Sequence, residues 1–347
     1  MKALFISLST YDIVGGIQTY NKKFIRALGC NDIEYKIISL HDKGNRKDGV
    51  VGCNSNILKF IFYILINVRY ADINVWAHIN LSSIFMMMKT LLKGKSLLIT
   101  HGVEVWYDDL TKVKKKSLKL YDKILSVSNY TKRKLISVQG IEESRIEILA
   151  NSIDLSNKNG FDSPFSPEKF NLLTVLRIDA SEKLKSIFNI LEALVILDDS
   201  RIVFTIIGKG NQLDFVKSKV SEMGLEDQVN ILGYVNDLRP YFEHCDLFTL
   251  ISDKEGFGIV YLEAMEYKKP CLAAKHCGSS DVVVDNFNGY SIAIDDIDSL
   301  VDRVTKLRFD TAKREIFGIN GNQLLHDKFT FESFIKVQIS HLKRICE

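Results

Sequence analysis

The sequence lacks the cysteine patterns that define several classes of small or metal-bound protein. Its six cysteines form no Cys-x-x-Cys pair, and none alternates with histidine at the spacing of a zinc site. The 347 residues also contain no short internal repeat and no low-complexity tract. These absences exclude a zinc-stabilised module and indicate reduced, buried thiols in a cytosolic protein. The length of 347 residues predicts two domains.

Long apolar runs are missing as well. The most apolar stretch, residues 57–68, falls short of the roughly 20 residues that a helix needs to cross a bilayer. Residues 3–8 are apolar too, but they are too few for a secretory leader and lack a small-residue cleavage site. We therefore expect neither a membrane span nor a leader, and we interpret residues 57–68 as a buried or interfacial helix.

The net charge of +3 is unevenly distributed. Residues 1–165 hold 24 Lys and Arg against 15 Asp and Glu, a net charge of +9, and the remainder carries −6. A basic first half indicates an anionic partner such as a membrane surface, a diphosphate or a nucleic acid. The densest basic run, residues 112–119, has no aromatic side chains between its lysines, so we expect no nucleic acid. The alternative to binding an anionic partner is that this run forms the solvated face of a helix.

Short apolar runs alternate with longer amphipathic stretches along most of the chain. This rhythm predicts β-α-β units, in which helices cover both faces of a parallel sheet. The rhythm breaks at residues 156–170, which contain two of the four prolines, and then starts again. The sequence thus predicts an α/β fold of two doubly wound, Rossmann-like domains that face each other across a cleft. The expected strands are residues 3–8, 35–40, 74–78, 96–100, 123–127, 145–149, 171–176, 203–207, 229–232, 247–250, 270–274 and 289–294.

Glycine and histidine residues follow the expected strands of the first domain. Gly15 and Gly16 come just before a predicted helix, where free amides favour an anion and glycine allows close approach. A plain tight turn accounts for them as well. His101 follows a strand, so it would lie at the carboxyl edge of the sheet, where open α/β folds bind ligands. A structural histidine is the alternative, but its position and the following Gly102 favour a functional His101.

Basic and glycine residues follow the strands of the second domain. Arg177 and Lys185 lie behind its first strand, where Arg can hold phosphate oxygens in a bidentate manner and Lys adds a point charge. An ordinary surface loop is the alternative. Gly208 ends the next strand, and Tyr234 and Val235 end the one after it, so all of them are expected at one sheet edge.

The segment from Glu255 to Glu263 carries the strongest signal. Gly256 and Gly258 flank Phe257 at the start of a predicted helix, so free N–H groups and a positive dipole end point at the sheet edge. Carboxylates before the helix and within it can accept hydrogen bonds from sugar or ribose hydroxyls, while the amides bind phosphate. A capped helix with two ordinary glutamates is the alternative.

With these residues in place, the chain resembles the retaining glycosyltransferases of family 4, which have the GT-B fold. Glu255 and Glu263 match the family's E-x7-E motif. Arg177 and Lys185 match its diphosphate-binding pair, with Glu182 at the acidic position that precedes the lysine. Other agreeing pieces follow in family order at residues 15–16, 100–106, 126–128 and 150–154. Two glycines of the family's basic loop are replaced, by Leu176 and Ser186.

The resemblance implies transfer of a hexose from a UDP- or GDP-linked sugar, with residues 164–329 as the nucleotide-sugar domain. Arg177 and Lys185 would stabilise the leaving diphosphate. Glu255 would hold donor-sugar hydroxyls, Glu263 the ribose, and His101 would reach the donor sugar. The remaining residues implied in donor binding are Gly15, Gly16, Gly208, Tyr234, Val235, Gly256, Phe257 and Gly258.

The resemblance also implies an acceptor domain at residues 1–163, with a C-terminal helix at 330–347 packed back on it. The acceptor would be a glycan or lipid-linked glycan of O-antigen, capsule or lipopolysaccharide synthesis. The +9 charge of the first half, the basic run at 112–119 and the apolar segment at 57–68 fit peripheral association with the inner face of the cytoplasmic membrane, which we state as a hypothesis. No metal is implied, because the D-x-D sequence at 296–298 is expected to be a turn or helix cap. A sugar-nucleotide epimerase and an inactive nucleotide-sugar-binding protein are the alternatives.

Overall fold

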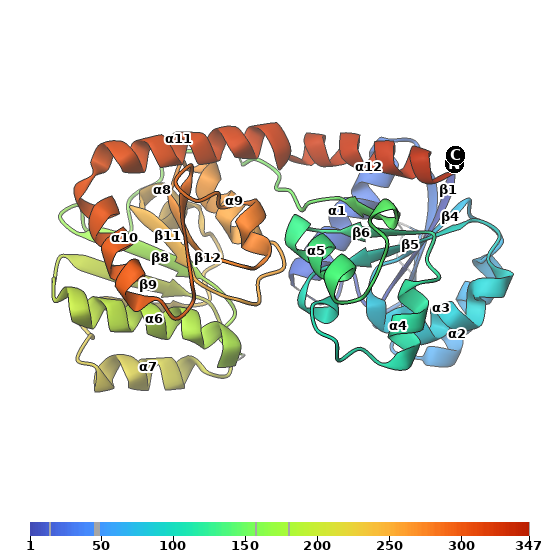
Figure 1. Ribbon diagram of the computed structural model, residues 1–347, viewed down its shortest axis with the longest axis horizontal. Coiled ribbons are helices and arrows are strands. Elements are labelled where there is room, and N and C mark those ends of the chain that lie inside the picture. Colours follow the sequence, from blue (N-terminus) through green and yellow to red (C-terminus); the bar gives the residue numbers. More distant parts are fainter. Residues whose placement is uncertain (14, 45–48, 157, 180, 347) are drawn as a thin grey trace. The chain divides into compact units, whose positions relative to one another are not determined.

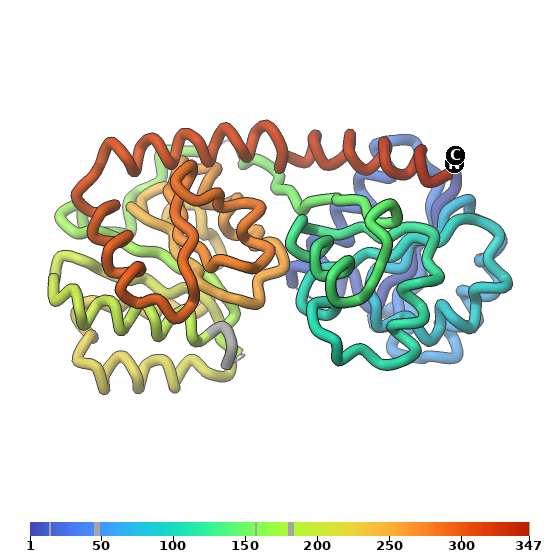
Figure 2. The backbone as a smooth tube through the Cα atoms, viewed as in Figure 1, coloured from blue at the N-terminus to red at the C-terminus, as the bar shows by residue number. Residues whose placement is uncertain are grey.

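The computed structural model describes residues 1–13, 15–44, 49–156, 158–179 and 181–346, with the backbone alone for residues 181–183. The chain divides into two compact units, shown in Figure 1. Unit 1 comprises Met1–Ser152 and Phe331–Glu347, and unit 2 comprises Ile153–Thr330. The chain therefore passes between the units twice, as Figure 2 allows the reader to follow.

Unit 1 is built on a sheet of seven parallel strands in the order β3-β2-β1-β4-β5-β6-β7. The central strands are buried almost throughout, as expected for a parallel sheet with helices on both faces. The strands are β1 (Lys2–Ser7), β2 (Glu34–Ser39), β3 (Val50–Gly52), β4 (Ile73–Trp76), β5 (Lys95–Thr100), β6 (Lys123–Ser126) and β7 (Ile146–Ile148). The helices are α1 (Gly16–Cys30), α2 (Ile57–Asn67), η1 (Ile79–Leu81), α3 (Ser82–Met88), η2 (Lys89–Leu91), η3 (Val103–Val105), α4 (Lys112–Leu118), α5 (Asn129–Ser137) and η4 (Glu143–Arg145).

The C-terminal helix α12 (Phe331–Cys346) completes unit 1 and packs on α1. Buried Gln338 donates a hydrogen bond from Nε2 to the Phe24 carbonyl oxygen (2.8 Å), and the Phe334 ring meets Tyr20 edge-on at 5.6 Å. The last turn of α12 lies beside the first residues of β1, so both chain ends meet at one corner of unit 1 (Figure 1).

Unit 2 contains a sheet of six parallel strands in the order β10-β9-β8-β11-β12-β13. The strands are β8 (Phe170–Val175), β9 (Ile202–Ile207), β10 (Val229–Gly233), β11 (Leu247–Leu250), β12 (Cys271–Ala274) and β13 (Gly289–Ile292). The helices are α6 (Ser181–Leu197), α7 (Leu213–Glu222), α8 (Arg239–His244), α9 (Ile259–Glu266), η5 (Gly278–Asp281), α10 (Ile297–Phe309) and α11 (Thr311–Lys328). In both units the first strand lies inside the sheet and the order reverses beside it, which is the doubly wound pattern.

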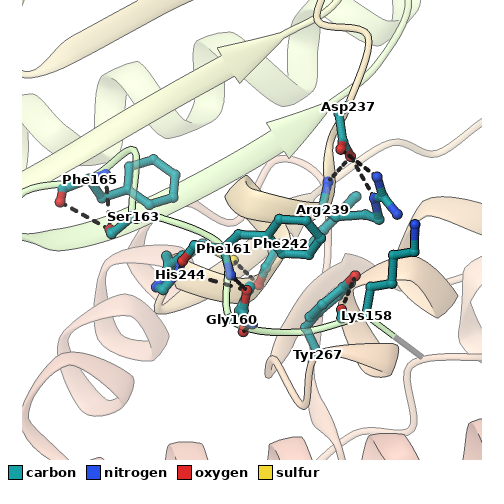
Figure 3. A network of polar contacts seen from close by, with 12 residues as sticks. Lys158, Gly160, Phe161, Ser163, Phe165, Asp237, Arg239, Phe242, His244 and Tyr267 are labelled. Carbon is teal, nitrogen blue, oxygen red and sulfur yellow. Dashed lines mark hydrogen bonds and ion pairs between the residues drawn. The ribbon is translucent and has the colours of Figure 1, made fainter. Parts of the chain in front are cut away.

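The segment after the first crossing is bound to unit 2, and this corrects the predicted boundary at residue 163 (Figure 3). The amides of Gly160 and Phe161 donate to the two carboxylate oxygens of Glu243 (2.7 and 2.9 Å). His244 Nε2 donates to the Phe161 carbonyl oxygen at 2.7 Å. These contacts satisfy a polar backbone stretch that the sequence alone presents as a free linker. Residues 153–163 therefore belong to unit 2.

Two further details bear on expectations from the sequence. Asp296, the first residue of the D-x-D sequence, caps α10 by accepting hydrogen bonds from the Ser299 amide (3.0 Å) and hydroxyl (2.6 Å), so the prediction of a helix cap is confirmed. Among the residues that the structure describes, no helix has both the length and the apolar character to cross a bilayer.

Candidate active site

Three loops meet at the carboxyl edge of the unit 2 sheet, where β8, β9 and β10 end. The Gly208 amide donates to the Gly233 carbonyl oxygen (2.8 Å), which ties the β9 loop to the β10 loop. A Cβ atom at Gly208 would lie 1.8 Å from the Leu176 carbonyl oxygen, so a larger residue fits only if the β8 loop moves. Close backbone packing thus requires glycine at 208, and its contact with a ligand stays a prediction.

Arg177 and Lys185 lie at the same edge, and each is held by a carboxylate. The Arg177 guanidinium pairs with Asp179, and Lys185 Nζ pairs with Asp295, which follows β13. The two basic side chains are 67% and 46% exposed, so both ion pairs are weak and an anionic ligand can replace the carboxylates. The side chain of Glu182, the acidic residue of the resemblance, lies outside the described part of the structure.

The two departures from the family's glycines both brace this loop. Buried Ser186 accepts a hydrogen bond on its Oγ from the Ile251 amide (2.8 Å), which fixes the start of α6 against the end of β11. The Leu176 side chain is buried, and its amide donates to the Ile207 carbonyl oxygen (3.0 Å). The loop that carries Arg177 is therefore anchored on both sides, by the Ser186 hydroxyl and by the buried Leu176 side chain, neither of which glycine could supply.

Glycine is also required where α9 begins. Gly258 precedes the helix with φ +85°, and a Cβ atom there would lie 2.5 Å from the Tyr261 ring. Gly256 is in close contact with Gly278, where a Cβ atom would lie 1.8 Å from the Gly256 carbonyl oxygen. Phe257 is buried and its ring meets Phe329 edge-on at 5.5 Å, so its side chain belongs to the core and only its backbone is left for a ligand.

The two glutamates of the motif are half-buried, Glu255 before α9 and Glu263 within it. The backbone of Glu255 is fixed, because its carbonyl oxygen accepts the Gly278 amide at 2.7 Å. Tyr261 lies beneath and donates its hydroxyl hydrogen to the Leu250 carbonyl oxygen. Burial raises the pKa of Tyr261, and negative charge on nearby Cys277 or Glu255 would raise it further. The floor of this site is therefore a neutral phenol.

An aromatic ring and a cation lie at the β10 side of the same edge. Tyr234 is 67% exposed, and Lys209 Nζ lies 4.9 Å from the centre of its ring. Val235, the next residue, is half-buried. Lys209 escaped the sequence analysis, although its place directly after Gly208 could have identified it. The pair presents a flat, exposed surface of the kind on which a nucleobase stacks.

In unit 1, the glycine loop before α1 is organised by a carboxylate that sequence analysis missed. Buried Asp42 accepts hydrogen bonds from the Ser9 hydroxyl (2.8 Å) and from the amides of Thr10 (2.9 Å) and Asp12 (3.0 Å). Gly15 then caps α1, and the helix begins at residue 16. Asp42 follows β2, so only the pairing of β1 with β2 brings it under this loop.

Asparagine at position 42 is expected to destabilise the protein by about 3 kcal/mol at pH 7, because an amide cannot replace a carboxylate that accepts so many hydrogen bonds. Burial favours the neutral acid, but these hydrogen bonds outweigh it and lower the pKa of Asp42. Because the pKa of Asp42 is lower in the folded protein than in the unfolded chain, its carboxylate stabilises the folded protein at pH values above the unfolded-state pKa of about 3.9. This stabilisation is lost as the pH falls through the folded-state pKa.

Urea unfolding of the wild type and Asp42→Asn at pH 7 and at about pH 3 checks this expectation, and the difference should shrink in acid. Asp227→Asn is a matched control, because exposed Asp227 makes no hydrogen bond to the rest of the described chain. A difference between wild type and Asp42→Asn that stays constant with pH would contradict the assignment.

His101 is held in one orientation after β5. Its Nε2 donates to the Ala77 carbonyl oxygen (2.9 Å), so Nδ1 of the neutral ring is left as an acceptor. The ring stacks on His78 at 6.0 Å and meets the Tyr20 ring edge-on at 5.4 Å. Burial lowers the pKa of His101 and takes that of His78 to about 4, so both rings are neutral at pH 7. The sequence analysis missed His78.

Each unit thus gathers its own candidate residues at the carboxyl edge of its own sheet. Unit 2 brings together the loops of Arg177, Gly208, Tyr234 and Glu255, and Lys185 reaches the loop after β13. Within the described ranges, no three His, Cys, Asp or Glu side chains are grouped as metal ligands would be. The edge of unit 2 offers cations, free helix amides and carboxylates, which can bind a diphosphate and sugar hydroxyls.

Comparison with known families agrees with this geometry. Residues 14–157 match the family described as Glycosyltransferase Family 4, and residues 158–324 match the family described as Glycosyl transferases group 1. Each match covers most of one unit, and together they take in most of the chain. The chain therefore belongs to the glycosyltransferases of these families.

Named relatives are distant. An uncharacterized glycosyltransferase of Methanocaldococcus jannaschii, MJ1607, is 24% identical over 63% of this chain and 59% of its own length. The poly(ribitol-phosphate) alpha-N-acetylglucosaminyltransferase of Staphylococcus aureus is 26% identical over 56% of this chain and 41% of its own length. The chain thus matches only about half the length of these relatives.

Solved structures share the fold over the whole chain. Anabaena HepE, solved in complex with UDP, superposes with a TM-score of 0.82 at 17% identity, covering 99% of this chain and 100% of that one. TarM superposes with a TM-score of 0.81 at 14% identity, covering 100% of this chain and 99% of that one. These neighbours are GT-B glycosyltransferases, so the predicted fold class is confirmed.

Proposed function

We propose that this chain transfers a hexose from a UDP- or GDP-linked sugar to a glycan or lipid-linked glycan acceptor in cell-surface polysaccharide synthesis, with retention of configuration. One observation carries the proposal: a glycine-initiated helix, two half-buried glutamates and two replaceable basic residues share the carboxyl edge of the unit 2 sheet. Solved neighbours support the donor class, because HepE structures contain UDP and UDP-glucose.

In this proposal the diphosphate displaces Asp179 and Asp295 and takes their places beside Arg177 and Lys185. Negative charge grows on the diphosphate as the glycosidic bond breaks, so the two cations stabilise the transition state more than the ground state. The amides at Gly256–Gly258 add to this effect. No metal ion is assigned a part, and transfer is expected to continue in EDTA.

The other residues hold the donor in place. Glu255 accepts hydrogen bonds from donor-sugar hydroxyls, Glu263 binds the ribose, and Tyr234 stacks on the base with Val235 beside it. Gly15, Gly16 and His101, at the carboxyl edge of the unit 1 sheet, are the unit 1 residues proposed to contact the donor.

The acceptor is proposed to bind unit 1, as a glycan or lipid-linked glycan of O-antigen, capsule or lipopolysaccharide. The basic first half of the chain supports peripheral contact with the inner face of the cytoplasmic membrane. Some named relatives act on related material: one is a galactosyltransferase that uses a diphosphoundecaprenol-linked sugar, and another is a capsular polysaccharide biosynthesis glycosyltransferase.

A thermal-shift screen over UDP, GDP, ADP and their sugars is the first test. We expect the midpoint of unfolding to rise with either UDP or GDP and their sugars, because a ligand that binds only the folded state stabilises it. No shift with any nucleotide would sink the proposal. Turnover of the stabilising nucleotide sugar without an acceptor would favour an epimerase, and binding without any turnover in the presence of membrane extract would favour an inactive protein.

A further inference from the structure

Helix α2 is an exposed apolar element of unit 1. Only Phe60 and Ile64 are fully buried, and they hold the helix on the sheet. A helix turns about 100° per residue, so four other side chains project together from the opposite side. These are Leu58, Phe62, Leu65 and Ile66, which are 75, 56, 43 and 59% exposed.

The outer side of a surface helix normally carries charged residues. In α2 the only charged residue is Lys59, which donates to the Gly52 carbonyl oxygen (3.1 Å) and so is directed at unit 1. The connection from β3 to β4, which contains α2, and the connection from β4 to β5, which contains α3, run across the sheet in the same direction. Because connections between parallel strands are right-handed, both helices lie on the same face of the sheet. There Met87 and Leu91 add two more exposed apolar side chains.

Negative charge is nearly absent from this part of the chain. Between residues 49 and 103 the only carboxylate is Asp72, against five Lys and Arg. Asp72 is engaged, because it accepts a hydrogen bond from the Lys2 amide at 2.8 Å. At the C-terminal end of α2, Lys36 Nζ donates to the Asn67 side chain (3.0 Å), which brings a further cation to the helix. The apolar side is therefore bordered by positive charge.

A cavity of about 890 Å³ opens where α2 ends, at the amino edge of the unit 1 sheet. Five Lys and Arg line it against three Asp. Within the described ranges, four of the five make no ion pair, and these are Arg69, Lys93, Lys95 and Lys343. The cavity lies at the opposite sheet edge from His101, so a partner bound there leaves the candidate active site open.

We propose that unit 1 docks on an anionic lipid bilayer through an anchor surface made of Leu58, Phe62, Leu65 and Ile66 with Arg69 and Lys93. The four apolar side chains enter the boundary between headgroups and acyl chains, and the two cations bind lipid phosphates. The eleven residues of α2 span about 16 Å, too short to cross a bilayer and suited to lying in its surface.

The proposed function includes peripheral contact with a membrane, and the anchor surface says which residues make that contact. Only the biological purpose of the anchor surface rests on the proposed function. Its test needs no sugar transfer. A second copy of this chain could instead cover the apolar side of α2. In a two-fold dimer, however, the basic residues that border this side would face the same basic residues of the other copy and repel them. An anionic bilayer carries the opposite charge and so complements this border.

The full chain is mixed with vesicles of phosphatidylcholine alone or with phosphatidylglycerol, at low and high salt, and sedimented. We expect binding to the phosphatidylglycerol vesicles at low salt and weaker binding at high salt. Leu58→Ser with Phe62→Ser should weaken binding at least tenfold. Phe309→Ser with Ile316→Ser, at residues 70% and 56% exposed in unit 2, is the matched control and should bind like the wild type.

Arg69→Gln with Lys93→Gln should weaken binding and flatten its salt dependence, and Lys328→Gln with Lys336→Gln should not, although both control lysines are exposed. Failure of the wild type to bind these vesicles at low salt would overturn the proposal, as would unchanged binding of the Leu58/Phe62 variant. The proposal would also be overturned if the wild type formed a concentration-dependent dimer and bound no vesicles, and if the Leu58/Phe62 variant abolished that dimer. A nucleotide thermal shift retained by every variant separates this result from failure of the proposed function.

Discussion

Replacing Glu255 with glutamine is expected to slow sugar transfer at least about 100-fold while nucleotide affinity changes by less than about threefold. A single group that stabilises the transition state is worth about two to three orders of magnitude in rate. The substitution keeps the hydrogen bond from the Gly278 amide, because Glu255 accepts it on its backbone carbonyl oxygen. The rate of product formation and the nucleotide Kd are measured side by side.

The matched control is Glu192→Gln. Glu192 is an exposed glutamate on α6, and it has no hydrogen bond or ion pair within the described part of the chain. The control should retain wild-type rate and affinity. Equal loss of rate in both variants, or loss of nucleotide binding with unchanged rate per bound donor, would contradict the role given to Glu255.

Alanine at position 258 is expected to destabilise unit 2 by about 2–5 kcal/mol and to weaken nucleotide binding at least tenfold. The left-handed conformation alone costs a non-glycine residue about 1–2 kcal/mol. At φ +85° the new Cβ atom would also lie 2.5 Å from the buried Tyr261 ring, and such overpacking costs a further 1–3 kcal/mol or so. Displacing this ring would shift the first turn of α9.

Gly224→Ala separates the cost of the left-handed backbone from the cost of the steric contact. Gly224 has φ +66°, but no atom lies within 4 Å of its Cβ position. The control should lose only about 1 kcal/mol and bind nucleotide normally. The midpoints of urea unfolding give the stabilities. Indistinguishable midpoints for the two variants would show that the contact with Tyr261 is not the origin of the glycine requirement.

The strands were predictable because a parallel sheet buries both of its faces, so its strands appear as short, nearly continuous apolar runs. Strand β3 escaped prediction, since three residues are too few to form a pattern. Helix α11 escaped because Gly318 and Gly321 interrupt its sequence. A Cβ atom at Gly318 would lie 1.9 Å from the Lys268 carbonyl oxygen, so close helix packing, and not local preference, selects glycine there.

The candidate site was predictable where it follows single strands, and it was not where distant loops meet. Arg177 and Lys185 stand out as cations after β8, but their partners depend on topology: Asp295 reaches Lys185 from a loop after β13. Asp42 belongs to the β2 loop and organises a loop after β1. Such contacts join residues that are far apart in the sequence, and the hydrophobic periodicity of a sequence does not predict them.

The proposal that the edge of unit 2 binds a nucleoside diphosphate is tested most directly by calorimetric titration. The nucleoside, its monophosphate and its diphosphate are compared on the wild type and on Arg177→Gln with Lys185→Gln. We expect affinity to rise with each phosphate, and the double variant to lose at least tenfold for the diphosphate and little for the nucleoside. Equal affinities for the three ligands, or a double variant that binds the diphosphate like the wild type, would contradict the account.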